Sequence, residues 1–227
     1  MKKVLLIGFA MVFAIVTQAQ EVRKQTGGEK NLEFLFSPLG GSPVSINGIK
    51  FRKFTSATDA LRATVFLGLG SSTDKRLAEN EDETELKDVE SSWNVSVAVG
   101  KEWHFAGTDN LSPYVGAEVL LGYGQESMRM EGLDADEDVI DARKERQGTF
   151  TAGLNAFAGC DVYVADNFYF GGELGFGFLF ESMGNMVVET PDGDGGTNTT
   201  ETPGGSSINV GPNVVGQIRA GFLFGGQ

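Results

Sequence analysis

The sequence predicts an all-β fold, an eight-stranded antiparallel up-and-down transmembrane β-barrel. Eight segments alternate apolar residues with polar residues or glycine, the pattern of a strand that has two different faces. Their connections alternate between short turns and longer acidic segments, which is the layout of a transmembrane barrel. The only long apolar run lies at the start of the chain, and it is too short for a membrane helix.

That first run predicts a cleaved signal peptide over residues 1–19. Two lysines, Lys2 and Lys3, precede an apolar stretch from Val4 to Val16, and Ala19 ends the segment where a signal peptidase cleaves. A polar N-terminal leader follows over residues 20–28, and residues 29–227 form the predicted barrel domain. The single cysteine, Cys160, cannot form an internal disulfide and is interpreted as a packing residue.

The clearest unit is a hairpin over residues 149–180, with a tight turn at Ala165–Asn167. Every second residue of its second strand is apolar, whereas the positions between are mostly glycine or polar. The remaining strands are expected near residues 32–37, 45–54, 61–70, 93–105, 114–124 and 208–224. The strand at 45–54 is the least regular, and the preferred register places Ile49 and Phe51 on the apolar face.

The apolar faces are interpreted as facing lipid. A soluble lipocalin-like barrel is the alternative, with apolar residues inside and polar residues outside. The polar faces here combine charges with many glycines, which are too small to form the wall of a ligand site. Aromatic residues gather near both ends of the apolar faces, as in the girdles of membrane barrels. The predicted interfacial aromatics are Trp93, Trp103, Phe105, Tyr123, Phe168, Phe170, Phe222 and Phe224.

The formal net charge of −13 lies almost wholly in three predicted connections, residues 71–92, 125–147 and 181–205. Such acidic surfaces repel nucleic acid, so that class of partner is excluded. Asp192 and Asp194 alternate as calcium ligands do, but the segment lacks the later glutamate of a calcium loop. A flexible acidic loop, disordered over residues 193–207, is therefore preferred to a metal site.

Charged residues on the polar strand faces are expected to meet in the lumen. An eight-stranded barrel is only wide enough for side chains to fill it, and buried charges persist mainly when they are paired. The preferred interpretation is an ion-pair network that fills the lumen, and the alternative is a narrow ion path. Glu118 and Glu173 are equal candidates as partners of Arg219. The predicted network is Arg62, Glu102, Glu118, Asp161, Glu173 and Arg219. Glu33 is also expected inward, and so are Lys50 and Arg52 if the preferred register of the strand at 45–54 holds.

His104 is the only histidine, and it lies beside the predicted short turn at residues 107–110. A barrel hydrolase needs a histidine with Ser or Asp near the opposite membrane face, and no second histidine can replace it. His104 is interpreted as a satisfied surface or rim residue. No catalytic residues and no cofactor are expected.

The alternation and the placement of aromatics resemble the small eight-stranded outer-membrane β-barrel proteins of the OmpA/OmpX type. This group is often described as porin-family or outer-membrane β-barrel domain proteins. The resemblance covers residues 29–227, and no periplasmic peptidoglycan-binding domain follows the last strand, unlike in OmpA itself.

The resemblance implies the outer membrane of a Gram-negative bacterium, with both termini periplasmic and the acidic segments at the cell surface. Membrane lipid and lipopolysaccharide are the expected partners, together with an extracellular ligand or divalent cations at the acidic loops. The expected function is non-enzymatic, a structural or surface-interaction role, and the alternative is a small passive pore for ions or small solutes. The oligomeric state stays open.

Overall fold

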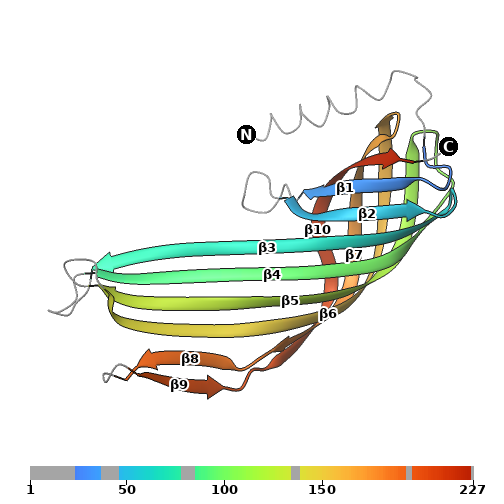
Figure 1. Cartoon of the computed structure of the whole chain (residues 1–227). Coiled ribbons are helices and arrows are strands. Elements are labelled where there is room, and N and C mark those ends of the chain that lie inside the picture. Colours follow the sequence, from blue (N-terminus) through green and yellow to red (C-terminus); the bar gives the residue numbers. More distant parts are fainter. Residues whose placement is uncertain (1–23, 37–45, 78–84, 134–138, 193–195, 226–227) are drawn as a thin grey trace.

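The computed structural model describes residues 24–36, 46–77, 85–133, 139–192 and 196–225 (Figure 1). The predicted signal peptide, residues 1–19, lies outside these ranges, and so do residues 20–23 of the leader. The described strands are β1 (Lys30–Phe36), β2 (Ile46–Phe54), β3 (Asp59–Leu77), β4 (Glu85–His104), β5 (Leu111–Leu133), β6 (Val139–Ala165), β7 (Phe168–Met183), β8 (Met186–Pro191), β9 (Thr197–Thr202) and β10 (Ser206–Phe224).

Eight of these strands close into a ring in which each strand pairs with two neighbours. The order is β1, β2, β3, β4, β5, β6, β7 and β10, and β10 pairs back with β1. Every pairing is antiparallel. The predicted eight-stranded antiparallel barrel is therefore confirmed. No helix in the described ranges is long and apolar enough to cross a membrane.

The two faces of the ring follow the predicted alternation, including the irregular β2. Ile49 and Phe51 are exposed on the outside, whereas Lys50 and Arg52 are fully buried inside. This arrangement confirms the preferred register of β2. The outside is thus apolar and the inside polar, the reverse of a soluble barrel.

Four strands continue far beyond the ring, which corrects two of the three predicted acidic connections. The ladder between β3 and β4 runs to the pair Leu77 and Glu85, and that between β5 and β6 to Leu133 and Val139. Residues 71–92 and 125–147 are therefore mostly strand. In Figure 1 these four strands form a long sheet beyond the ends of β1 and β2. We call residues 70–77, 85–92, 125–133 and 139–148 the extension.

A further hairpin, β8 and β9, widens the extension at β6. Strand β8 pairs with β6 around Lys144 and Glu189, and a 3.2 Å ion pair joins Arg146 to Glu189. The predicted disorder of residues 193–207 is wrong for the described part, because β9 and the start of β10 occupy it. Threonine, a β-branched residue that favours strands, recurs through β9. Residues 193–195 lie outside the described ranges.

The short turns and the described part of the leader lie at the other end of the ring. The turn from β6 to β7 consists of Asp166 and Asn167, and Asn167 has a φ of 64°, which asparagine tolerates. Its carbonyl accepts a 2.7 Å hydrogen bond from the N–H of Leu223 in β10. The leader is fixed to the same end, because Gly28 N–H donates to the carbonyl of Phe54 at 2.9 Å.

Candidate functional site

The charged side chains of the inner face meet in the middle of the ring. The structure brings together all six residues of the predicted set, and it adds Glu33, Lys50 and Arg52. Each comes from an inward position of its strand, so every strand of the ring contributes at least one. We call the following residues the lumen network: Glu33, Lys50, Arg52, Arg62, Glu102, Glu118, Asp161, Glu173 and Arg219.

Arg52 on β2 makes three close ion pairs in the lumen network. Its guanidinium lies 2.6 Å from Glu33, 2.8 Å from Glu102 and 2.8 Å from Asp161. Arg52 has no exposed surface. Its charge is therefore balanced by carboxylates from β1, β4 and β6, strands that are not all neighbours. Three aromatic rings also lie 5.2, 5.8 and 5.2 Å from the guanidinium carbon: Phe54, Tyr114 and Tyr169.

Arg219 on β10 is the second fully buried arginine. It lies 3.1 Å from Glu33, 2.8 Å from Asp161 and 3.6 Å from Glu173. Two partners were expected for Arg219, Glu173 and Glu118. Glu173 is one of its contacts, at the longest of the three distances. Glu118 pairs instead with Arg62, at 2.9 Å. The strand pattern cannot distinguish these acids, because both point inward.

Arg62 and Lys50 share the remaining carboxylates. Arg62 lies 3.1 Å from Glu102 and 2.9 Å from Glu173. Lys50 lies 3.2 Å from Glu173. The lumen network thus holds five carboxylates and four bases, nearly balanced, as burial of charge requires. The Phe157 ring packs 3.8 Å from the guanidinium carbon of Arg62.

Two tyrosines that were not predicted as lumen residues form hydrogen bonds with the lumen network. The Tyr114 hydroxyl donates to Glu173 at 2.9 Å, and the Tyr169 hydroxyl donates to Glu33 at 2.6 Å. Both occupy inward positions, so the alternation that identified the charges could also have identified them. Inward glycines give these rings room: a Cβ at Gly159 would collide with Tyr114, and one at Gly221 with Tyr169.

His104 lies between the lumen network and the short turns of the ring. Its Nδ1 is 2.9 Å from the Ser112 hydroxyl and its Nε2 is 3.1 Å from Glu102. His104 lies near the short turn, as predicted, and both of its ring nitrogens have polar partners. The predicted surface location is wrong, because the imidazole ring is buried. The reason is Gln25 of the leader, which covers this end and donates to Ser112 at 2.5 Å.

The leader makes further contacts at this end. Lys24 donates from Nζ to the carbonyl of Thr108 at 2.9 Å. Glu29 accepts hydrogen bonds from the Thr26 hydroxyl at 2.5 Å and from the Gly27 N–H at 2.6 Å. Burial alone raises the pKa of Glu29, but these hydrogen bonds outweigh it and hold the pKa below its usual value. The carboxylate therefore stabilises the turn at residues 26–29 as an anion.

The predicted interfacial aromatics lie on the outer face near both ends of the ring. Trp93 and Tyr123 contact each other at 5.7 Å between ring centroids near the extension, and Phe168 and Phe170 do so at 5.1 Å near the short turns. Phe168 is half-buried. The other seven are exposed: Trp93, Trp103, Phe105, Tyr123, Phe170, Phe222 and Phe224.

Lys101 is the single base in the apolar pattern of β4, and its contacts explain its position. It pairs with Asp59 at 2.8 Å and lies 5.3 Å from the ring of Trp103. Both partners stand near the short turns, where a long side chain reaches the membrane boundary. Lys101 is therefore compatible with an outer face that is otherwise apolar.

The candidate metal residues do not form a site in the described part of the chain. Asp192 accepts a 2.7 Å hydrogen bond from the N–H of Gly196, which closes a turn between β8 and β9. Asp194 lies outside the described residues. Within those residues, no three His, Cys, Asp or Glu side chains converge as metal ligands would.

Two comparisons with known proteins found matches. The model of the putative OmpA-OmpF-like porin family matches residues 81–182, from the start of β4 into β7. The crystal structure of the outer membrane protease OmpT from Escherichia coli is 8% identical, with a TM-score of 0.29 over 86% of this chain and 93% of that chain. No curated protein matches the chain. The family match and the closed ring identify a membrane β-barrel protein, and the predicted resemblance to small outer-membrane barrels of the OmpA/OmpX type is confirmed.

Proposed function

We propose that this protein is a non-enzymatic barrel of the Gram-negative outer membrane whose lumen is closed by ion pairs. Its role is structural, or it is the interaction of the extension with molecules at the cell surface. The observation that carries the proposal is the burial of Arg52 and Arg219 among carboxylates from strands on opposite sides of the ring. Charges held this closely leave little room for a continuous water path.

The outer face supports the membrane location. Leucines at mid-strand stand out from the ring: Leu67 is 66% exposed, Leu174 is 61% exposed and Leu121 is 54% exposed. A continuous apolar belt of this kind is unstable in water and is satisfied by lipid. The acidic extension then lies outside the membrane, where its charges are hydrated. In the orientation usual for such barrels, the extension faces the cell exterior and the short turns face the periplasm.

The surroundings of His104 support a non-enzymatic role. Its contacts with Ser112 and Glu102 superficially match a hydrolase triad. The Ser112 side chain, however, is fully buried, and it already accepts a hydrogen bond from Gln25. Glu102 is also committed to Arg52 and Arg62. A substrate has no route to this serine while the leader is in place, so we assign these contacts to packing.

Single-channel recording in planar lipid bilayers tests the proposal against a passive pore. We expect the purified wild-type protein to show no steady conductance steps. Arg52→Ala should produce steps, because unpaired buried carboxylates draw water into the lumen. Arg129→Ala, which removes an exposed arginine of the extension, is the control and should stay silent. Steady, salt-dependent steps from the wild-type protein would support the pore and overturn the closed lumen.

A further inference from the structure

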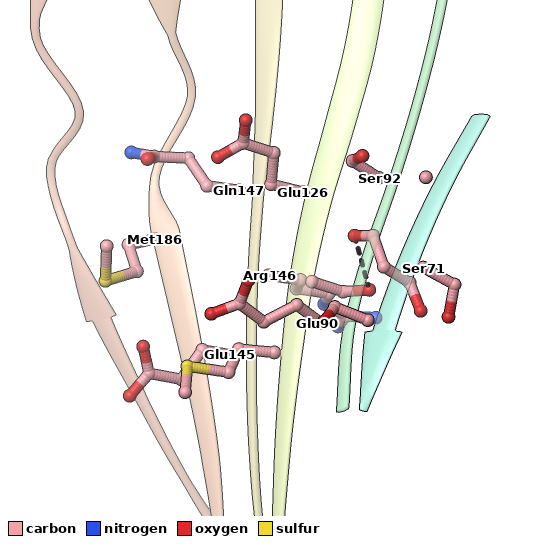
Figure 2. Close-up of a pocket in the computed structure, with 13 residues that line it drawn as sticks. Ser71, Glu90, Ser92, Glu126, Glu145, Arg146, Gln147 and Met186 are labelled. Carbon is pink, nitrogen blue, oxygen red and sulfur yellow. Dashed lines mark hydrogen bonds between the residues drawn. The ribbon is translucent and has the colours of Figure 1, made fainter. Parts of the chain in front are cut away.

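The extension carries a cavity of about 490 Å³ that the lumen network does not use (Figure 2). Its floor consists of three adjacent rungs of the ladder across β3, β4, β5 and β6, from Gly70 to Ser72 on β3. Met186 of β8 borders it from the side. A volume of this size matches sites for small organic molecules.

Two carboxylates of this floor differ from two other glutamates of the extension, Glu131 and Glu145. Glu145 pairs with Arg143 at 2.5 Å, and Glu131 pairs with Arg129 at 2.5 Å. Glu90 and Glu126, in contrast, have no recorded ion-pair partner among the described residues. Arg146, which also lines the cavity, pairs with Glu189 at 3.2 Å, so no ion pair with a described residue offsets the negative charge of Glu90 and Glu126.

The spacing of these two carboxylates indicates the shape of a ligand. Glu90 stands opposite Met128, and Glu126 stands opposite Ser92, so the two acids are diagonal neighbours on one face. Side chains at such positions lie about 7–8 Å apart at the backbone, and two carboxylates alone supply fewer oxygen ligands than a calcium site needs. No convergent metal-ligand cluster occurs in the described part of the chain. Two separated negative charges best match a ligand with two separated positive charges.

The rest of the lining suits a flexible chain between those charges. The hydroxyls of Ser72 and Ser92 and the amide of Gln147 occupy the same face as the two acids and can accept N–H donors. The thioethers of Met128 and Met186 offer adaptable apolar contact. Methylene groups can pack against these sulfurs while amines reach the carboxylates.

We propose that this cavity binds linear organic cations with two or more amino groups, the chemistry of a polyamine. The inference deepens the proposed surface-interaction role by naming a ligand class for the extension, and it rests on that role. Ammonium groups donate charge-assisted hydrogen bonds to Glu90 and Glu126, and the carbon chain lies along the floor between them.

Isothermal titration calorimetry with spermidine tests the proposal, using the full-length mature protein in a non-ionic detergent at low salt. We expect saturable one-to-one binding, weakened about tenfold by Glu90→Gln and again by Glu126→Gln. Asp109→Asn is the matched control, because it removes the same charge from an exposed turn at the opposite end of the ring. It should leave the affinity unchanged.

Equal losses in the Asp109→Asn control and in the two glutamine variants would show that only net charge attracts spermidine, and would overturn the site. Binding unaffected by Glu90→Gln and Glu126→Gln would do the same. Competition by magnesium chloride at the same concentration as spermidine would identify a simple cation surface and also contradict the proposal. A conducting wild-type lumen would refute the closed barrel but would leave these affinities unchanged, so the two failures are distinguishable.

Discussion

The barrel lumen and the extension share four strands, β3 to β6, yet they use charge differently. Inside the ring, Arg52 is fully buried and contacts carboxylates from three other strands. In the extension, Arg129 has 48% of its side chain exposed and pairs with Glu131 two residues along its own strand. The ladder is continuous from one region to the other. The same residue type is therefore buried where the strands close into a ring and solvated where they do not, and this burial determines how much its ion pairs contribute to stability.

The largest expected difference between the two regions comes from removing one arginine in each. Arg52→Ala should lower the free energy of unfolding by about 3–5 kcal/mol, because it leaves buried carboxylates unpaired. Arg129→Ala should cost about 1 kcal/mol or less, because its partner can be solvated. Urea unfolding in detergent or lipid, followed by tryptophan fluorescence and heat-modifiable gel migration, measures both. Similar costs for the two variants would contradict the distinction between buried and solvated pairs.

A second pair of variants compares the outer faces of the two regions along one strand. Val65 and Thr73 both lie on β3 with the same orientation, the former in the ring and the latter in the extension. Val65→Arg should destabilise the assembled barrel by about 2–4 kcal/mol, because the charge meets the middle of the lipid layer. Thr73→Arg should be nearly neutral. The fraction of folded barrel after refolding into lipid vesicles gives the comparison, and equal yields would mean that the lipid boundary is misplaced.

The smallest expected effect lies at the short-turn end, in the hydrogen bonds of Glu29. An acid whose pKa is lowered in the folded protein stabilises it above the usual carboxyl range, and this contribution disappears as the pH falls through the lowered pKa. Glu29→Gln should therefore cost roughly 1 kcal/mol at neutral pH and progressively less in acid. Thermal melting of both proteins at stepwise lower pH measures the difference. A difference that grows in acid would have the wrong sign for this account.

The sequence predicted the inward charges well, because a period of two places each residue on one face without knowledge of its neighbours. It could not predict which base meets which acid. Contacts across the lumen depend on the stagger between strands, and Arg219 therefore reaches Glu33 and Asp161, whereas Glu118 reaches Arg62. The covering of His104 by Gln25 depends on the path of the leader, for which no periodic signal exists.

The extension was missed for a different physical reason. Strands outside an apolar environment have no face that must be apolar, so Glu90, Glu126 and their neighbours read as a charged loop. Backbone pairing with β3 and β6 holds them as strands nevertheless. The threonines of β9 carried a signal of β-branched residues that the glycines around them outweighed.

The seam between β1 and β10 has a consequence for the order in which the molecule forms. The two strands are separated by almost the whole chain, and Leu32 pairs with Phe222. Glu33 and Asp161 are synthesised long before Arg219, one of the two bases that they share. A chain that is still being exported therefore holds two carboxylates that lack this partner and two strands with open edges. Assembly must wait for β10, so long-range closure should limit its rate, and a chain truncated before residue 218 should remain unfolded and depend on chaperones.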